Sequence, residues 1–100
     1  MKIMISQPMN GKTNEQIREE RAELVEKLEK LGNEVVDTII SDFDDNTDPI
    51  LYLAKSIEFI ADVDGVVFMS GWEKARGCKI EHDVAVNYGK KVFYEYGVKD

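Results

Sequence analysis

The chain of 100 residues has little that could crosslink it, bind a metal or cross a membrane. Its single cysteine, Cys78, cannot form an internal disulfide, and one histidine with one cysteine leaves no zinc-ligand spacing. We therefore expect no metal, no cofactor and a reducing compartment, the cytoplasm. No apolar run approaches the ~20 residues that span a bilayer, and the N-terminal segment lacks the long apolar region of a signal peptide.

Basic residues are also scarce. Lysine and arginine number 13 against 20 aspartates and glutamates, which gives a net charge of −7. Nucleic-acid polymers are bound mainly by cationic side chains that neutralise phosphates, so we exclude such a partner. A single nucleoside or nucleotide needs only local hydrogen-bond donors. Apolar residues make up 43% of the chain and charged residues 33%, which predicts one globular domain over residues 1–100 with a modest core.

Apolar periodicity predicts alternating strands and helices. Strands are expected at Lys2–Ser6, Glu34–Ile40, Asp64–Met69 and Lys91–Tyr94. Helices are expected from a capping box at Thr13 to Leu31, from Pro49 to Ala61, and from Cys78 to Tyr88. This order predicts an α/β fold: a three-layer, Rossmann-like (flavodoxin-like) parallel sheet of about four strands flanked by three helices.

Ligands of open α/β sheets bind beyond the carboxyl ends of the strands. The segments expected there are Ser6–Lys12, Ser41–Asp48 and Ser70–Glu81. The first segment contains neither a dinucleotide-binding fingerprint nor a P-loop. Its Gln7 and Asn10 can still read the edge of a base, and Ser6 can bond to a sugar or phosphate oxygen.

Glu81 is the most informative candidate for chemistry. Helical spacing places it on one face with Val84, Ala85 and Tyr88, which we expect to point into the core. Near the start of its helix, free N–H groups and the helix dipole favour an anion. The pattern predicts a buried, ionised carboxylate aimed at the crevice, able to attack a sugar carbon. The alternative is a glutamate that only caps its own helix or pairs with a neighbouring cation.

Other candidates carry two interpretations each. Trp72 lies in a glycine-flanked loop and either stacks on a base or covers the sheet edge. Arg21 lies beside the apolar stripe of its helix, where it can hold a buried acid or a ligand phosphate, or extend to solvent. We expect His82 to be solvated and Cys78 to be a small buried residue, although its place at a helix start can lower a thiol pKa.

Three blocks of sequence resemble the nucleoside 2-deoxyribosyltransferase-like superfamily. They are Asp64–Phe68, the loop Gly71–Gly77, and Glu81 followed by Ala85 and Gly89-Lys90. The start, Ile5–Gly11, is similar to the first strand and loop of that family, and small bacterial and phage members of the DUF4406 type match best.

The resemblance implies that Glu81 is the nucleophile of a covalent glycosyl–enzyme intermediate, which another base or water then releases. It also implies that Ser6, Gln7 and Met9 help to form the pocket. Where family enzymes carry an aspartate on the helix before the third strand, this sequence has Ser56, which cannot serve as the same proton donor. The full predicted substrate-binding set is Ser6, Gln7, Met9, Asn10, Arg21, Ser70, Gly71, Trp72 and Gly77.

Three functions are compatible with these residues. The first is an enzyme of N-glycosidic bonds, a 2-deoxyribosyltransferase or an N-glycoside hydrolase acting on a small-molecule nucleoside or nucleotide. The second is a nucleotide-binding module without efficient chemistry, such as a sensor or sequestering protein. The third is a small interaction domain in which Glu81 is structural. A four-stranded sheet leaves open edges and family members are usually oligomers, so we expect a homo-oligomer.

Overall fold

Strands and helices alternate along the chain as the sequence predicts. The structure, a computed structural model, describes residues 1–39 and 46–98. Within these residues the strands are β1 (Lys2–Ser6), β2 (Glu34–Val35), β3 (Gly65–Phe68) and β4 (Lys91–Tyr94). The α-helices are α1 (Asn14–Lys30), α2 (Pro49–Ala61) and α3 (Arg76–Asn87), and the short 3-10 helices are η1 (Trp72–Lys74) and η2 (Glu95–Gly97).

The described strands form one parallel sheet in the order β2-β1-β3-β4. The chain places β2 on one side of β1 and then crosses back to place β3 and β4 on the other side. In parallel sheets the loops that follow the two strands at such a reversal diverge and leave a crevice. Here the two strands are β1 and β3, so the crevice is expected beyond Ser6 and Phe68, which pair in register.

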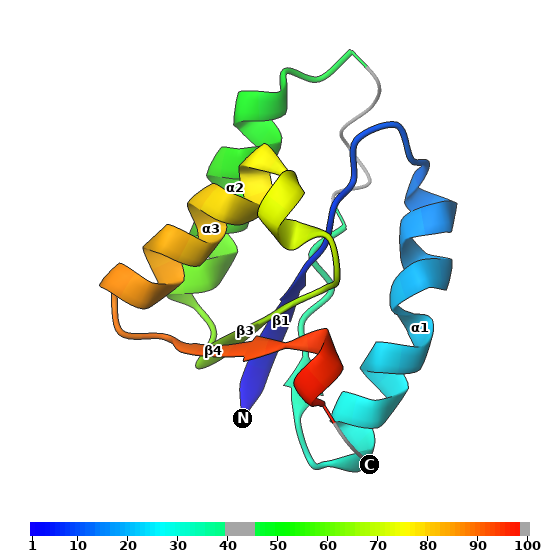
Figure 1. Cartoon of the computed structure of the whole chain (residues 1–100), viewed down its shortest axis with the longest axis vertical. Helices are drawn as coiled ribbons and strands as arrows, with labels where there is room; N and C mark the ends of the chain where they lie inside the picture. The colour runs from blue at the N-terminus through cyan, green and yellow to red at the C-terminus, as the bar shows by residue number, and fades with distance from the viewer. Residues whose placement is uncertain (40–45, 99–100) are drawn as a thin grey trace.

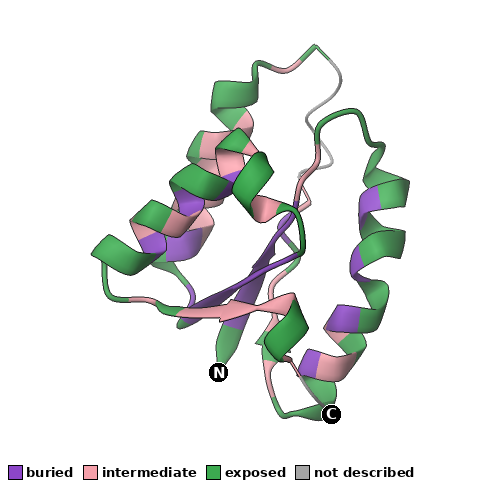
Figure 2. Cartoon of the chain, in the orientation of Figure 1, coloured by how far each residue is buried: buried purple, intermediate pink, exposed green. Residues whose placement is uncertain are grey.

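Helices cover both faces of the sheet, with α1 on one side and α2 and α3 on the other (Figure 1). Because neighbouring residues of a strand point to opposite faces, each strand feeds two cores. Ile3 and Ile5 of β1 pack with Leu24 of α1, whereas Met4 packs with Ala85 of α3. The helices are buried along the sides that face the sheet (Figure 2). The predicted three-layer, Rossmann-like α/β fold with a four-stranded parallel sheet is confirmed.

The predicted capping box at the start of α1 is also confirmed. The Thr13 hydroxyl accepts a hydrogen bond from the Gln16 N–H at 3.1 Å, and the Gln16 side-chain oxygen accepts from the Thr13 N–H at 2.9 Å. After the helix, Gly32 has a φ of 91°, a left-handed conformation that glycine adopts without strain. These two ends fix α1 and with it the position of Arg21.

Two element boundaries differ from the prediction. The second strand was expected to run from Glu34 to Ile40, but β2 ends at Val35. Just after β2, the carboxylate of Asp37 accepts a hydrogen bond from the N–H of Ile39 at 3.0 Å, a local bond of the kind that competes with pairing in a sheet. The predicted acidic loop Ser41–Asp48 lies mostly outside the described residues.

The third helix begins two residues before the predicted start and ends at Asn87. Glu81 is therefore the sixth residue of α3, beyond the free N–H groups of its first turn. Tyr88 follows the helix and is 78% exposed, so the prediction that it points into the core is wrong. No helix among the described residues has the length and apolar character needed to cross a membrane.

Candidate functional site

A cavity of about 750 Å³ opens beyond the carboxyl ends of β1 and β3. Its walls come from the loop after β1, from one side of α2, and from the junction of η1 with α3. Its volume lies within the range of about 300–1,000 Å³ that is usual for small-molecule sites. The predicted site residues that line it are Ser6, Gln7, Met9, Asn10, Gly71, Gly77 and Glu81.

Glu81 lies in this cavity with 8% of its surface exposed. The hydroxyl of Ser6, at the end of β1, donates a hydrogen bond to Glu81 Oε2 at 2.5 Å, and Ser56 of α2 is also hydrogen-bonded to the carboxyl group. The predicted burial of Glu81 is confirmed. Its predicted support from the helix N-terminus is wrong, because hydroxyl groups from two other elements hold the carboxylate instead.

Burial raises the pKa of Glu81 above its ordinary value of 4.5. The hydrogen bonds from Ser6 and Ser56 and the positive charge of Arg21 act in the opposite direction, since each favours the carboxylate. The net effect is a carboxylate that is less well solvated than in water and more basic. Both properties make it a better nucleophile once it is ionised.

This raised pKa makes a prediction for stability against pH. Between pH 4.5 and the raised pKa, folded Glu81 holds a proton that the unfolded chain has released. Its contribution to stability is therefore fully present below about pH 4.5 and is lost as pH rises through the folded-state pKa. We expect the free energy of unfolding of Glu81→Gln, minus that of the wild type, to increase with pH across this window. Denaturant unfolding at several pH values measures the difference, and a difference independent of pH would contradict the prediction.

Cys78 also lines the cavity and is buried, as predicted. Burial raises the pKa of its thiol to about 11, with the negative charge of Glu81 acting in the same direction and a hydrogen bond with Ser6 acting against both. The pKa of this thiol is therefore raised and not lowered, with burial as the largest cause. At neutral pH Cys78 is therefore a neutral thiol beside Glu81 and does not compete with it as a nucleophile.

Gln7 lines the cavity, but its side chain is occupied by the protein. Its Nε2 donates to the carbonyl of Ile17 at 3.1 Å and to Glu20 at 3.2 Å, while its Oε1 accepts from Arg21 Nε at 2.7 Å. An amide has two N–H groups, and both are used here. Gln7 therefore shapes the wall, and neither of its N–H groups is free to read the edge of a base. Arg21 lies behind Gln7 and is not among the lining residues, so a direct contact with a ligand phosphate is not what the structure shows.

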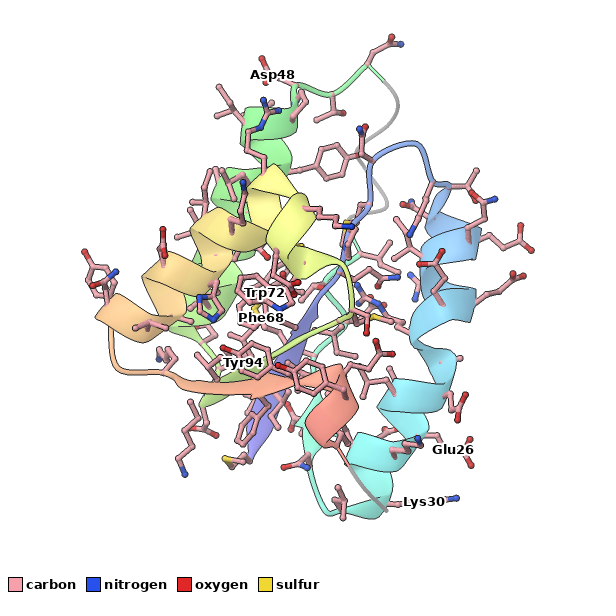
Figure 3. The ribbon with its side chains drawn as sticks, in the orientation of Figure 1. Glu26, Lys30, Asp48, Phe68, Trp72 and Tyr94 are labelled. Atoms are coloured by element: carbon pink, nitrogen blue, oxygen red, sulfur yellow. The ribbon has the colours of Figure 1, made fainter. Side chains whose placement is uncertain are left out.

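Trp72 lies outside the cavity. Its ring stacks on His82, with centroids 4.2 Å apart and planes at 15°, and lies 5.5 Å from Phe68 and 5.8 Å from Tyr94. Figure 3 shows Phe68, Trp72 and Tyr94 together where α3 meets β3 and β4. The ring is occupied by protein neighbours, so the alternative interpretation, packing at the sheet edge, replaces the predicted stacking on a base.

The expectations for His82 and Ser70 also change. His82 is half-buried in this aromatic cluster and its Nε2 is hydrogen-bonded to the hydroxyl of Tyr94 at 2.8 Å, so the prediction of a solvated histidine is wrong. Ser70 is exposed, donates its N–H to Glu95 Oε1 at 2.9 Å, and is not among the lining residues. Its neighbour Gly71 does line the cavity.

Neither Tyr52 nor Ser56 is in the predicted substrate-binding set. Both lie on α2 and line the cavity, together with Pro49 and Leu53. The signal was available, because spacings of three and four residues place side chains on one face of a helix. Tyr52 and Ser56, four residues apart, share one face of α2 in this way.

Among the described residues that line the cavity, basic side chains outnumber acidic ones, unlike in the acidic chain as a whole. Lys12, Lys74 and Arg76 line it, and Lys12 is paired with Glu20 at 2.9 Å. α3 begins here without a side-chain cap, so the N–H groups of its first turn add partial positive charge. Among residues 1–39 and 46–98, no three His, Cys, Asp or Glu side chains gather as a metal site would require. The lining is suited to an anionic organic ligand.

Comparisons with known proteins agree with the resemblance found in the sequence. A family model described as "Domain of unknown function (DUF4406)" matches residues 1–94. The structure of the CMP N-glycosidase BcmB of Clostridium botulinum is similar, with a TM-score of 0.62 and 20% sequence identity over 94% of this chain and 67% of that chain. At this identity the likeness establishes the fold. No match is found among curated proteins.

Proposed function

The chain belongs to the family described as a domain of unknown function (DUF4406), and from the geometry of its pocket we propose that it cleaves the N-glycosidic bond of a nucleotide. The observation that carries the proposal is Glu81, a buried carboxylate held by the hydroxyls of Ser6 and Ser56 in a cavity of nucleotide size. The fold is shared with a protein named as a CMP N-glycosidase, which supports the same class of chemistry.

In the proposed reaction an oxygen of the Glu81 carboxylate attacks C1′ of the sugar. The bond between C1′ and the base nitrogen breaks, and the base leaves with the electron pair and takes a proton from water. Water then attacks C1′ of the glycosyl ester, the bond to Glu81 breaks, and the proton of the attacking water returns to solvent. A second base in place of water would give a transfer reaction. Ser6 and Ser56 orient the carboxylate, which must be positioned before it reacts.

We propose a nucleoside monophosphate as the substrate. Lys74 and Arg76 line the cavity, and the first turn of α3 offers N–H groups beside them. Helix N-termini and cationic side chains together bind phosphate. Tyr52, Met9 and Leu53 provide apolar walls suited to a base. The cavity thus offers a charged end and an apolar end, as a nucleotide does.

This substrate assignment predicts a selective loss of affinity. Lys74→Met and Arg76→Met should each raise the KM for a nucleoside monophosphate by about tenfold, the effect of losing one charge-assisted hydrogen bond, and leave the KM for the nucleoside unchanged. Lys79→Met is the control, because Lys79 is exposed on α3, the helix that contains Arg76, and does not line the cavity. Equal KM changes for nucleoside and monophosphate would argue against a phosphate contact.

The second candidate is a nucleotide-binding module without efficient chemistry. Ser56 favours it, because a hydroxyl rather than a carboxyl group accompanies Glu81 and cannot protonate a leaving base as an acid would. Nucleotides would stabilise such a module against unfolding, more strongly the more tightly they bind, and the module would release no base.

A panel of ribonucleosides, deoxyribonucleosides and their monophosphates separates the two. Free base is measured by chromatography after incubation with the wild type or Glu81→Gln, and thermal unfolding is measured with the same compounds. We expect the wild type to release base from at least one monophosphate and Glu81→Gln to release none. No release by the wild type, or equal release by the variant, would reject the enzyme, and ligand-dependent stabilisation alone would then identify the binding module.

A further inference from the structure

Among residues 1–39 and 46–98, no buried carboxylate is hydrogen-bonded to the buried cation Arg21. Only 5% of the residue is exposed. Its Nε donates to Gln7 Oε1 at 2.7 Å and its Nη1 donates to Thr38 Oγ1 at 3.2 Å, so both of these hydrogen-bond partners are neutral. Within the part of the chain that the structure describes, the buried Nη2 has no hydrogen-bond partner. Burial among neutral groups is costly for a guanidinium, because it replaces water with weaker dipoles. The position therefore calls for a compensating negative charge nearby.

Glu81 is in the complementary situation. It is buried, and its hydrogen-bond partners are the neutral hydroxyls of Ser6 and Ser56. Arg21 belongs to α1 and Glu81 to α3, on opposite faces of the sheet (Figure 1). Each charge is neutralised only partly by the groups that touch it.

The end of β1 connects the two charges. Ser6 is its last residue and bonds to Glu81, while the next residue, Gln7, bonds to Arg21. Successive side chains along an extended chain point to opposite faces, which accounts for this division. The connection is therefore Arg21 to Gln7, along one peptide to Ser6, and on to Glu81.

We propose that Arg21 is a positioning residue that keeps the Glu81 carboxylate charged and in place from the opposite face of the sheet. Attraction between buried opposite charges is weakly screened and extends beyond direct contact. The charge of Arg21 lowers the pKa of Glu81 against the effect of burial. Burial lowers the pKa of Arg21, and two carboxylates act in the opposite direction. The larger effect comes from Asp37, which is exposed and paired with Arg18 at 3.1 Å, and the smaller from Glu81.

The other ionisable groups around Glu81 are less suited to this role. Those that share its cavity among the described residues are Lys12, Tyr52, Lys74, Arg76 and Cys78. The three cations are exposed, so water and salt screen them, and the Cys78 thiol is neutral. Arg21 lies outside this set, but unlike these three cations it is buried.

The direct test is the carboxyl titration of Glu81, followed by carbon NMR in the wild type, Arg21→Met and Arg18→Met. We expect Arg21→Met to raise the pKa of Glu81 by about half a unit or more. Arg18→Met is the matched control, because it removes an exposed cation one turn away on α1 and should leave the titration unchanged. Arg21→Lys keeps the positive charge, so the pKa of Glu81 in this variant should lie close to its wild-type value. An unchanged titration in folded Arg21→Met would overturn the proposal.

The wild type provides a second test that does not depend on the folding of a variant. If buried Arg21 holds the charge of Glu81, raising the salt concentration about tenfold should leave the titration of Glu81 nearly unchanged. If the exposed cations Lys74 and Arg76 hold it, the pKa of Glu81 should rise as salt screens them. The second result would overturn the role of Arg21.

A catalytic role of Arg21 rests on the proposed function, whereas its effect on the charge of Glu81 does not. For an active enzyme, the acid limb of kcat/KM in Arg21→Met should move to higher pH by the same amount as the titration. If no substrate releases base, the proposed function fails, and the NMR titration still decides whether Arg21 acts on Glu81.

Discussion

Glu81→Gln should reduce base release by on the order of a thousand-fold or more, because an amide cannot form the glycosyl ester that the carboxylate forms. The change keeps the size of the side chain, and its amide oxygen can still accept the hydrogen bond from Ser6. Glu73→Gln is the matched control, since it makes the same change at an exposed residue of η1. Single-turnover release of base, with enzyme in excess over substrate, measures the chemical step without product release.

The same variant separates loss of chemistry from loss of fold. Because burial makes ionised Glu81 costly, Glu81→Gln should unfold at the same or a higher temperature than the wild type at neutral pH. An inactive variant that remains fully folded places the defect in the reaction itself. A folded Glu81→Gln that keeps activity within tenfold of the wild type would contradict the role of the carboxylate as nucleophile.

Phe68→Ala should be the most damaging substitution for stability. Phe68 ends β3, is fully buried, and lies 4.9 Å from His82, 5.5 Å from Trp72 and 6.4 Å from Tyr94 between ring centroids (Figure 3). Removing a buried phenylalanine costs about 3–5 kcal/mol, a large part of the ~5–15 kcal/mol that stabilises a domain. At ~4–8 °C per kcal/mol, the unfolding temperature should fall by at least about 12 °C.

Phe68→Ala should also disturb the wall of the cavity. Trp72, which packs on Phe68, belongs to η1, and its neighbours Gly71 and Lys74 line the cavity. We therefore expect weaker nucleotide binding in Phe68→Ala even below its unfolding temperature. Tyr96→Ala is the control, because this ring is 74% exposed at the edge of the same cluster, and it should shift stability by less than about 1 kcal/mol. Similar losses in both variants would show that the cluster does not anchor η1.

Local patterns account for what could be predicted from the sequence. The capping box at Thr13 and the glycine at position 32 define α1 without knowledge of any distant residue. Helical periodicity was sufficient to predict that Glu81 is buried, because it shares a helix face with Ala85, one turn later, which is fully buried. Alternation of strands and helices, with short connections, then placed the carboxyl ends of the strands at one edge of the sheet.

Contacts between distant residues account for what could not be predicted. The partner of Glu81, Ser6, is 75 residues away, and no spacing rule connects a strand end to a helix face. We predicted Trp72 to lie in the pocket because its loop lies there. Its ring instead packs against His82 of α3 and Tyr94 of β4. Such choices depend on which side of a loop offers a packing surface, and that is decided only when the sheet has assembled.

Trapping the covalent intermediate tests the proposed role of Glu81 most directly. A nucleoside monophosphate with fluorine at C2′ slows the hydrolysis step, because the electron-withdrawing atom destabilises the cationic transition state. Mass spectrometry of the intact protein and of its peptides then locates any bound sugar phosphate. We predict a mass increase carried by the peptide that contains Glu81 and absent from Glu81→Gln. An adduct on another residue, or the same adduct in Glu81→Gln, would contradict the assignment of Glu81 as the nucleophile.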